Sequence, residues 1–153
     1  MDFILFVLII LVGAWVIYRF VPYHANTKTL DPDALMYFCV TQKSDGYTSI
    51  WPKDKQLGEC FEFGIAGITH CKGVDAYIGE GKGVLVADNK IPYDPNAIRI
   101  LAEDGHHLGY VPKDCNVRVR QSIKLPCECY YIILKGYDNG RTYYHTDCYI
   151  NLN

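Results

Sequence analysis

Two long runs of β-branched and aromatic residues flank an Asn-Gly pair near the end of the chain, and this pattern restricts the fold most. Asn139-Gly140 is the preferred sequence of a type I′ turn, whose twist matches that of two antiparallel strands. The pattern predicts a hairpin that joins about residues 129–137 to residues 141–150. In this register Asp138 faces Arg141 and Tyr131 faces Cys148.

The same register divides the side chains of the hairpin between two faces. Zinc needs ligands that converge on one point. His145 falls on one face of the hairpin, whereas Cys127, Cys129 and Cys148 fall on the other. We therefore expect no zinc or other cofactor here, and we expect the cysteines to act as small apolar core residues. The more apolar face carries Cys127, Cys129, Tyr131, Ile133, Cys148 and Ile150.

Short strands separated by glycine are predicted from residue 60 onward. Strands are expected over residues 83–88, 97–102 and 107–111, with a turn at Asp104-Gly105 between the last two. A helix is expected over residues 114–122. Many short strands with glycine-rich turns are typical of a barrel or sandwich, so the sequence predicts a mainly β fold with one or two short helices.

Length and composition limit the functions that the chain can have. Its 153 residues allow one compact domain and an appendage, and 50% hydrophobic residues exclude a wholly disordered protein. A formal net charge of −2 argues against binding along a long phosphate backbone. The seven cysteines form no recognisable disulfide framework, which favours a reducing compartment.

The first 21 residues predict a transmembrane anchor. Residues 3–17 carry no charged side chain, and the apolar run extends to residue 21 around Arg19. A cleaved signal peptide is the alternative, since Val12-x-Ala14 resembles a cleavage site. Trp15 and Tyr18 favour the uncleaved anchor, because such aromatics are common at membrane interfaces.

The charges beside this anchor predict its orientation. Only Asp2 precedes the apolar run, whereas Arg19 and Lys28 follow it, so the rest of the chain is expected in the cytoplasm. Residues 22–58 are expected to form a linker and a segment over about residues 34–41 that fits either a helix or a strand. Residues 59–153 then form the predicted β domain.

A turn with two prolines, Pro92 to Ile98, is the most informative candidate for function. Pro92 and Pro95 fix φ and favour extended neighbours, so they hold the turn in a rigid, non-helical form. Asp94 and Asn96 can cap backbone donors in the turn. Tyr93 is then left to offer a flat aromatic face.

Four motifs in this order resemble the HIRAN domain over about residues 60–150. They are Phe63-Gly64-Ile65-Ala66-Gly67-Ile68, Gly83-Val84-Leu85-Val86, the Pro92 to Ile98 turn, and Asp104-Gly105 leading into Leu108-Gly109-Tyr110-Val111-Pro112-Lys113. The resemblance implies a small β-barrel related to the OB fold, of OB-like or SH3-like form. It also implies binding of the 3′ end of single-stranded DNA without catalysis.

Strand-end binding needs an aromatic face, an acceptor for the sugar hydroxyl and a cation for the phosphate. The resemblance implies that Tyr93 stacks on the terminal base, Asp94 accepts from the 3′-hydroxyl and Lys113 contacts phosphate. Tyr110 stands where the family has a histidine near phosphate. Thr69 and His70 replace an Arg-Tyr pair of the DNA-binding members, which reduces one stacking surface and removes a cation.

Two other interpretations of the same residues remain open. Asp94 and Asn96 could serve only to cap the turn, with Tyr93 packed on it and Lys113 a solvated charge. The chain could also be a membrane-anchored protein-interaction module that uses exposed aromatics of the terminal hairpin.

No Walker loop, Gly-x-Ser-x-Gly elbow, His-Glu-x-x-His helix or dinucleotide fingerprint is present, so no enzyme is predicted. The expected partner is single-stranded nucleic acid or a nucleotide-like ligand.

Overall fold

The computed structural model describes residues 29–30, 36–44, 47–54, 59–138 and 140–151. The predicted anchor at residues 3–21 and about half of residues 22–58 lie outside these ranges. Among the residues that are described, no helix is long and apolar enough to cross a bilayer. The anchor and its cytoplasmic orientation therefore stay predictions.

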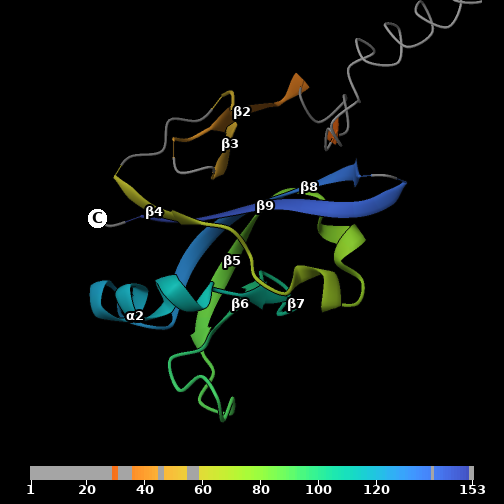
Figure 1. Ribbon diagram of the computed structural model, residues 1–153. Coiled ribbons are helices and arrows are strands. Elements are labelled where there is room, and N and C mark those ends of the chain that lie inside the picture. The colour runs from red at the N-terminus through yellow and green to blue at the C-terminus, as the bar shows by residue number, and fades with distance from the viewer. Residues whose placement is uncertain (1–28, 31–35, 45–46, 55–58, 139, 152–153) are drawn as a thin grey trace, which may run out of the picture.

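The main sheet is antiparallel and has seven strands (Figure 1). Its order is β4-β9-β8-β5-β6-β7, and β1 also pairs with β8. The strands are β1 (Thr29–Leu30), β4 (Cys60–Phe63), β5 (Gly79–Ala87), β6 (Ile98–Ala102), β7 (His107–Tyr110), β8 (Cys127–Asp138) and β9 (Arg141–Asn151). The helices that the structure describes are the 3₁₀ turns η2 (Ile68–His70) and η3 (Val74–Tyr77), and α2 (Lys113–Ser122). The predicted mainly β class is confirmed.

The predicted terminal hairpin is confirmed, with its register. Asp138 is opposite Arg141 and Tyr131 is opposite Cys148 in the β8-β9 ladder. Cys129, Tyr131, Ile133, Cys148 and Ile150 are buried in one core, as the alternation predicts. The other face of the hairpin is also buried, at Ile132, Leu134 and Tyr149, because a second layer covers it.

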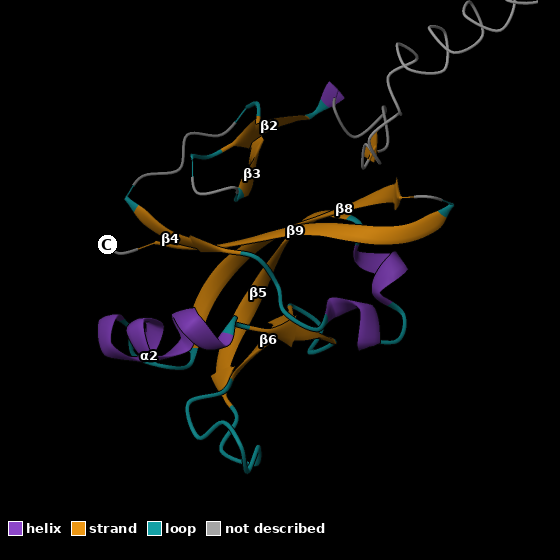
Figure 2. Ribbon diagram, viewed as in Figure 1, coloured by secondary structure: helices purple, strands orange, loops and turns teal. Residues whose placement is uncertain are grey.

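That second layer is a two-stranded sheet of β2 (Phe38–Gln42) and β3 (Thr48–Pro52). Residues 38–41 of the segment that fitted either a helix or a strand are therefore a strand. Figure 2 shows the β2-β3 hairpin lying over β8 and β9 on the side opposite α2. Phe38 and Ile50 pack on the outer face of the sheet, and the Trp51 ring lies 5.0 Å from the Tyr149 ring.

The main core lies on the inner face of the curled sheet. Leu85, Ile98, Ile100, Leu108 and Val119 have no exposed surface, and α2 contributes the last of these. Full burial of each such side chain stabilises the fold by about 1.5–3 kcal/mol. This core therefore holds together β5 and β6, which flank the turn with Tyr93 and Asp94, and β7 and α2, which carry Tyr110 and Lys113.

The sheet is closed less completely than the predicted OB-like or SH3-like barrel. An isolated bridge joins its two ends, where Ala66 N donates to Tyr110 O at 2.8 Å and Tyr110 N donates to Ala66 O at 2.9 Å. Among the described residues no further ladder pairs β4 with β7, so the sheet is a curled, partly closed barrel. Gly109 permits the close approach at the bridge, since its φ is +145° and a Cβ there would lie 2.6 Å from Ala66 O.

Candidate functional site

The turn with two prolines connects β5 to β6 and is held by its own backbone. Asp88 N donates to Ala97 O at 2.8 Å, and Ala97 N donates to Asp94 O at 3.1 Å. The carboxylate of Asp94 accepts from Asn96 N at 3.1 Å, as the predicted cap requires. The turn is thus locally ordered. The sequence predicted side-chain caps from both Asp94 and Asn96, and in the structure the side chain of Asp94 caps the turn.

Helix α2 also holds this turn, through two residues that the sequence analysis did not single out. Asn116 is 1% exposed, and its Nδ2 donates to Asp94 Oδ2 at 2.8 Å. Arg120 donates from Nε to Asn96 O and from Nη2 to Ala97 O, both at 3.0 Å. Asn116 and Arg120 are four residues apart in the predicted helix, so they lie on one face of it. This spacing is the sequence signal that could have identified them as a pair.

Tyr93 and Asp94 belong to the turn, and Lys113 belongs to the helix that the turn contacts. Tyr93 is 80% exposed, so its ring is accessible for stacking and does not pack on the turn. Lys113 is exposed and is the first residue of α2, one turn before Asn116. Residues three apart on a helix have Cβ atoms about 5–6 Å apart, so Lys113 lies close to the residue that binds Asp94.

Tyr110 ends β7, three residues before Lys113. Its hydroxyl lies 3.4 Å from Asp88 Oδ2, and Arg99 Nε lies 3.3 Å from the same oxygen. Burial and the Asp88 charge raise the pKa of Tyr110, so its hydroxyl stays protonated. Asp88 is 6% exposed and orients both neighbours, a role that no local sequence signal indicated.

An open groove of about 540 Å³ lies between η2 and β7. His70 and Tyr110 both line it, and Lys72 adds a cation beside them. Thr69 is exposed in η2 but does not line the groove. His70 and Tyr110 therefore line one groove, while Asp94 of the turn contacts Asn116 of the helix that begins at Lys113.

The groove also contains a cysteine and a histidine in contact. Cys71 Sγ lies 3.9 Å from His107 Nδ1, and burial raises the pKa of the Cys71 thiol. Burial also lowers the pKa of His107, which disfavours an imidazolium that would stabilise a thiolate. In the part of the chain that the structure describes, no three His, Cys, Asp or Glu side chains are grouped so as to hold a metal ion.

This fold and site define a class of protein. Its members are curled β-sheet domains in which a turn with an exposed aromatic residue packs against one helix. Comparison with protein families matches residues 58–151 to the HIRAN domain. The match covers more than half of the chain, and the chain belongs to the HIRAN domain family.

The crystal structure of the HIRAN domain of human HLTF is similar to the chain. The two are 16% identical in sequence, with a TM-score of 0.36, and the alignment covers 60% of this chain and 76% of that one. No curated protein sequence matches the chain.

Proposed function

We propose that this HIRAN domain binds the 3′ end of single-stranded nucleic acid, without catalysis, at the contact between the Tyr93 turn and the start of α2. The observation that carries the proposal is the 80% exposed ring of Tyr93 on a turn that is bonded to α2 beside Lys113. Membership of the HIRAN family supports a nucleic-acid partner. The exposed ring supports stacking, which contributes about 1–3 kcal/mol per base.

Asp94 can serve the turn and a ligand at once. Each of its carboxylate oxygens accepts one internal hydrogen bond, from Asn96 N and from Asn116 Nδ2. An ionised carboxylate has about four acceptor sites, so capacity remains for a sugar hydroxyl. The two internal bonds also fix the direction in which that capacity points. Lys113 would then neutralise the last phosphate.

The first test compares a short oligonucleotide that ends in a 3′-hydroxyl with the same strand ending in a 3′-phosphate. We expect the full chain, purified in detergent, to bind the hydroxyl form more tightly, because a 3′-phosphate would bring negative charge against Asp94. Tyr93→Ala should weaken binding about 5- to 150-fold, the equivalent of one lost stacking contact, while Tyr93→Phe retains it. Fluorescence anisotropy at fixed salt measures both effects.

A matched control lies on the terminal hairpin, where Tyr137 is 51% exposed. Tyr137→Ala removes an exposed tyrosine away from the proposed site and should leave oligonucleotide binding unchanged. Equal binding of the two strand ends by the full chain would reject the 3′-end proposal. A loss in Tyr137→Ala but none in Tyr93→Ala would instead favour an interaction surface on the hairpin.

We also propose that residues 3–21 tether the domain to a membrane, with the domain on the cytoplasmic side. The apolar run and the positive residues after it support this arrangement. Cys39 is exposed and serves as a reporter. A membrane-impermeant thiol reagent should label Cys39 only after the cells are permeabilised, whereas labelling in intact cells would reverse the orientation.

A further inference from the structure

The edge of the sheet at β4 is unpaired in the part of the chain that the structure describes. β4 is the last strand of the sheet order and pairs with β9 on one side only. Beyond its end, Ile65 N still donates to a side chain of β9, whereas Ala66 N and O face the other way and bond to Tyr110. Backbone groups of successive strand residues point to opposite sides. The N–H and C=O groups of Glu62 and Gly64 therefore point away from β9, at the open edge.

A groove of about 530 Å³ lies beside this edge. Its lining comes from β4 and the residues after it, from the β2-β3 hairpin through Lys43 and Tyr47, and from the start of α2 through Pro112 and Cys115. Figure 2 shows β4 between the hairpin and α2. The open edge thus lies in a groove with a wall on each face of the sheet, an arrangement that suits an added strand.

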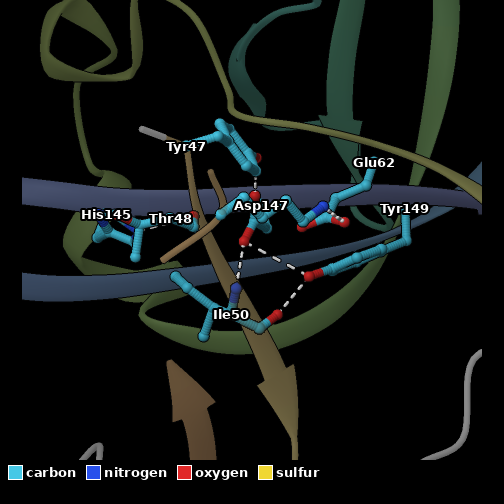
Figure 3. Close-up of polar contacts among 8 residues, drawn as sticks. Tyr47, Thr48, Ile50, Glu62, His145, Asp147 and Tyr149 are labelled. Carbon is cyan, nitrogen blue, oxygen red and sulfur yellow. Dashed lines mark hydrogen bonds and ion pairs between the residues drawn. The ribbon is translucent and has the colours of Figure 1, made fainter. Parts of the chain in front are cut away.

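Both walls are held by contacts with the sheet. On the outer face, the buried Asp147 accepts hydrogen bonds from the Tyr47 hydroxyl and from Ile50 N, the latter at 2.6 Å, as Figure 3 shows. On the inner face, the Arg118 guanidinium of α2 lies over the Phe61 ring of β4, 4.6 Å from its centroid. A groove whose walls are already ordered loses little conformational entropy when it binds a segment.

The charge of the groove indicates what kind of side chain it binds. Glu62 is opposite Tyr149, on the outer face of the sheet (Figure 3), and its side chain is 10% exposed. Its Oε2 pairs with Lys43 Nζ at 2.6 Å, but its Oε1 is buried and accepts no hydrogen bond from the described residues. A buried carboxylate oxygen without a donor is unfavourable. Asp114 adds a second carboxylate, so two carboxylates face one lysine among the described lining residues.

Charge and backbone geometry together favour an extended basic peptide in this groove. An ammonium or guanidinium group would donate to Glu62 Oε1, whereas the phosphates of a nucleic acid would be repelled by both carboxylates. A second copy of the chain, paired through the same edge, would bring like carboxylates together. Lys43 is 44% exposed, so its long side chain can shift to admit a second cation.

We propose that the open edge of β4 binds an extended segment of a partner protein as an added antiparallel strand, with a lysine or arginine opposite Glu62. Antiparallel pairing continues the pattern of the main sheet. The residue opposite Glu62 places its side chain on the same face, toward the buried carboxylate, while its neighbours turn toward the wall formed by α2. The backbone groups of Glu62 and Gly64 supply the ladder that fixes the segment. This interaction does not depend on the proposed nucleic-acid binding.

A blocked pentapeptide, acetyl-Thr-Val-Lys-Val-Thr-amide, tests the proposal by nuclear magnetic resonance titration of the full chain in detergent, which detects binding in the millimolar range. We expect the amide resonances of Glu62 and Gly64 to shift with the peptide. N-methylation of the lysine amide should weaken binding about 10-fold or more, because that N–H faces β4. N-methylation of the valine before it should leave binding unchanged, because that N–H faces solvent. Glutamate in place of the lysine should also weaken binding about 10-fold or more.

Three variants of the chain locate the peptide in this groove. Glu62→Gln should weaken its binding about 10-fold, because an amide replaces the carboxylate that binds the lysine. Glu103→Gln is the matched control, since Glu103 is exposed and does not line the groove, and it should bind as the natural chain does. Tyr93→Ala should also bind the peptide unchanged, so this proposal and the strand-end proposal can fail independently.

The proposal is overturned if Glu62 and Gly64 show no shift with millimolar peptide, if the two N-methylated peptides bind equally, or if Glu62→Gln has no effect. A stronger shift of the same amides by a single-stranded oligonucleotide would overturn it by assigning the groove to nucleic acid. Sedimentation of the chain as a dimer that the peptide dissociates would overturn it by assigning the edge to a second copy. The peptide variants test the ladder even where Glu62→Gln does not fold.

Discussion

Gly109→Ala should lower the free energy of unfolding by about 3 kcal/mol or more. The position has φ +145°, which residues with a side chain rarely adopt, and an added Cβ would lie 2.6 Å from both Ala66 O and Ile65 Cγ2. The conformational strain and the clash each cost about 1–3 kcal/mol. Both fall next to the Ala66-Tyr110 bridge, so the substitution strains the contact that closes the sheet.

Chemical denaturation followed by circular dichroism measures this loss. Gly105→Ala is the matched control, because Gly105 also has positive φ, +85°, but no atom lies within 4 Å of its added Cβ. That variant suffers the conformational strain alone and should lose less stability, about 1 kcal/mol. Equal losses in the two variants would show that the close approach at the bridge contributes nothing.

The second large effect is expected from Asn116→Ala, which should lower the free energy of unfolding by about 2–4 kcal/mol. The substitution leaves a cavity at a 1% exposed position and removes the donor to the half-buried Asp94 carboxylate. It also releases the Tyr93 turn from α2. If the proposed function holds, oligonucleotide affinity should therefore fall together with stability, although Asn116 does not touch the ligand.

Two further variants isolate the cause. Gln121→Ala changes an exposed residue of the same helix and should alter stability by less than about 0.5 kcal/mol. Asn116→Asp places a second carboxylate against Asp94, so it should destabilise the fold at pH 7 and do so less near pH 4, where one of the two carboxyls can bind a proton. If the Asn116→Ala variant is as stable as the Gln121→Ala variant, the Asp94-Asn116 hydrogen bond does not stabilise the fold.

Much of the fold could be predicted because its signals are local. The turn at residues 139–140 and the alternation beside it predicted the β8-β9 register, which the structure has. The helix predicted over residues 114–122 is α2, and the turn at Asp104-Gly105 lies just before β7. Motif order likewise indicated the HIRAN family, since matching residues are read one after another along the chain.

The contacts that position the candidate site could not be predicted in the same way. Asp94 and Asn116 are 22 residues apart in sequence, and the contact appears once α2 packs beneath the β5-β6 turn. The groove that joins His70 to Tyr110 also depends on how η2 meets β7. Closure of the barrel was overestimated, because family resemblance implies strands but not how many backbone pairs join the two ends.

The sequence by itself determined most strands after residue 60, the terminal hairpin, the family and the candidate residues Tyr93, Asp94 and Lys113, because turn chemistry and alternation act between near neighbours. Only the tertiary structure decided that the β2-β3 hairpin covers the outer face of β8 and β9, and that a buried Asp147 holds it. Ile132 and Leu134 look like any apolar strand residues in the sequence. Which surface covers them depends on packing between segments about 80 residues or more apart, which no local pattern specifies.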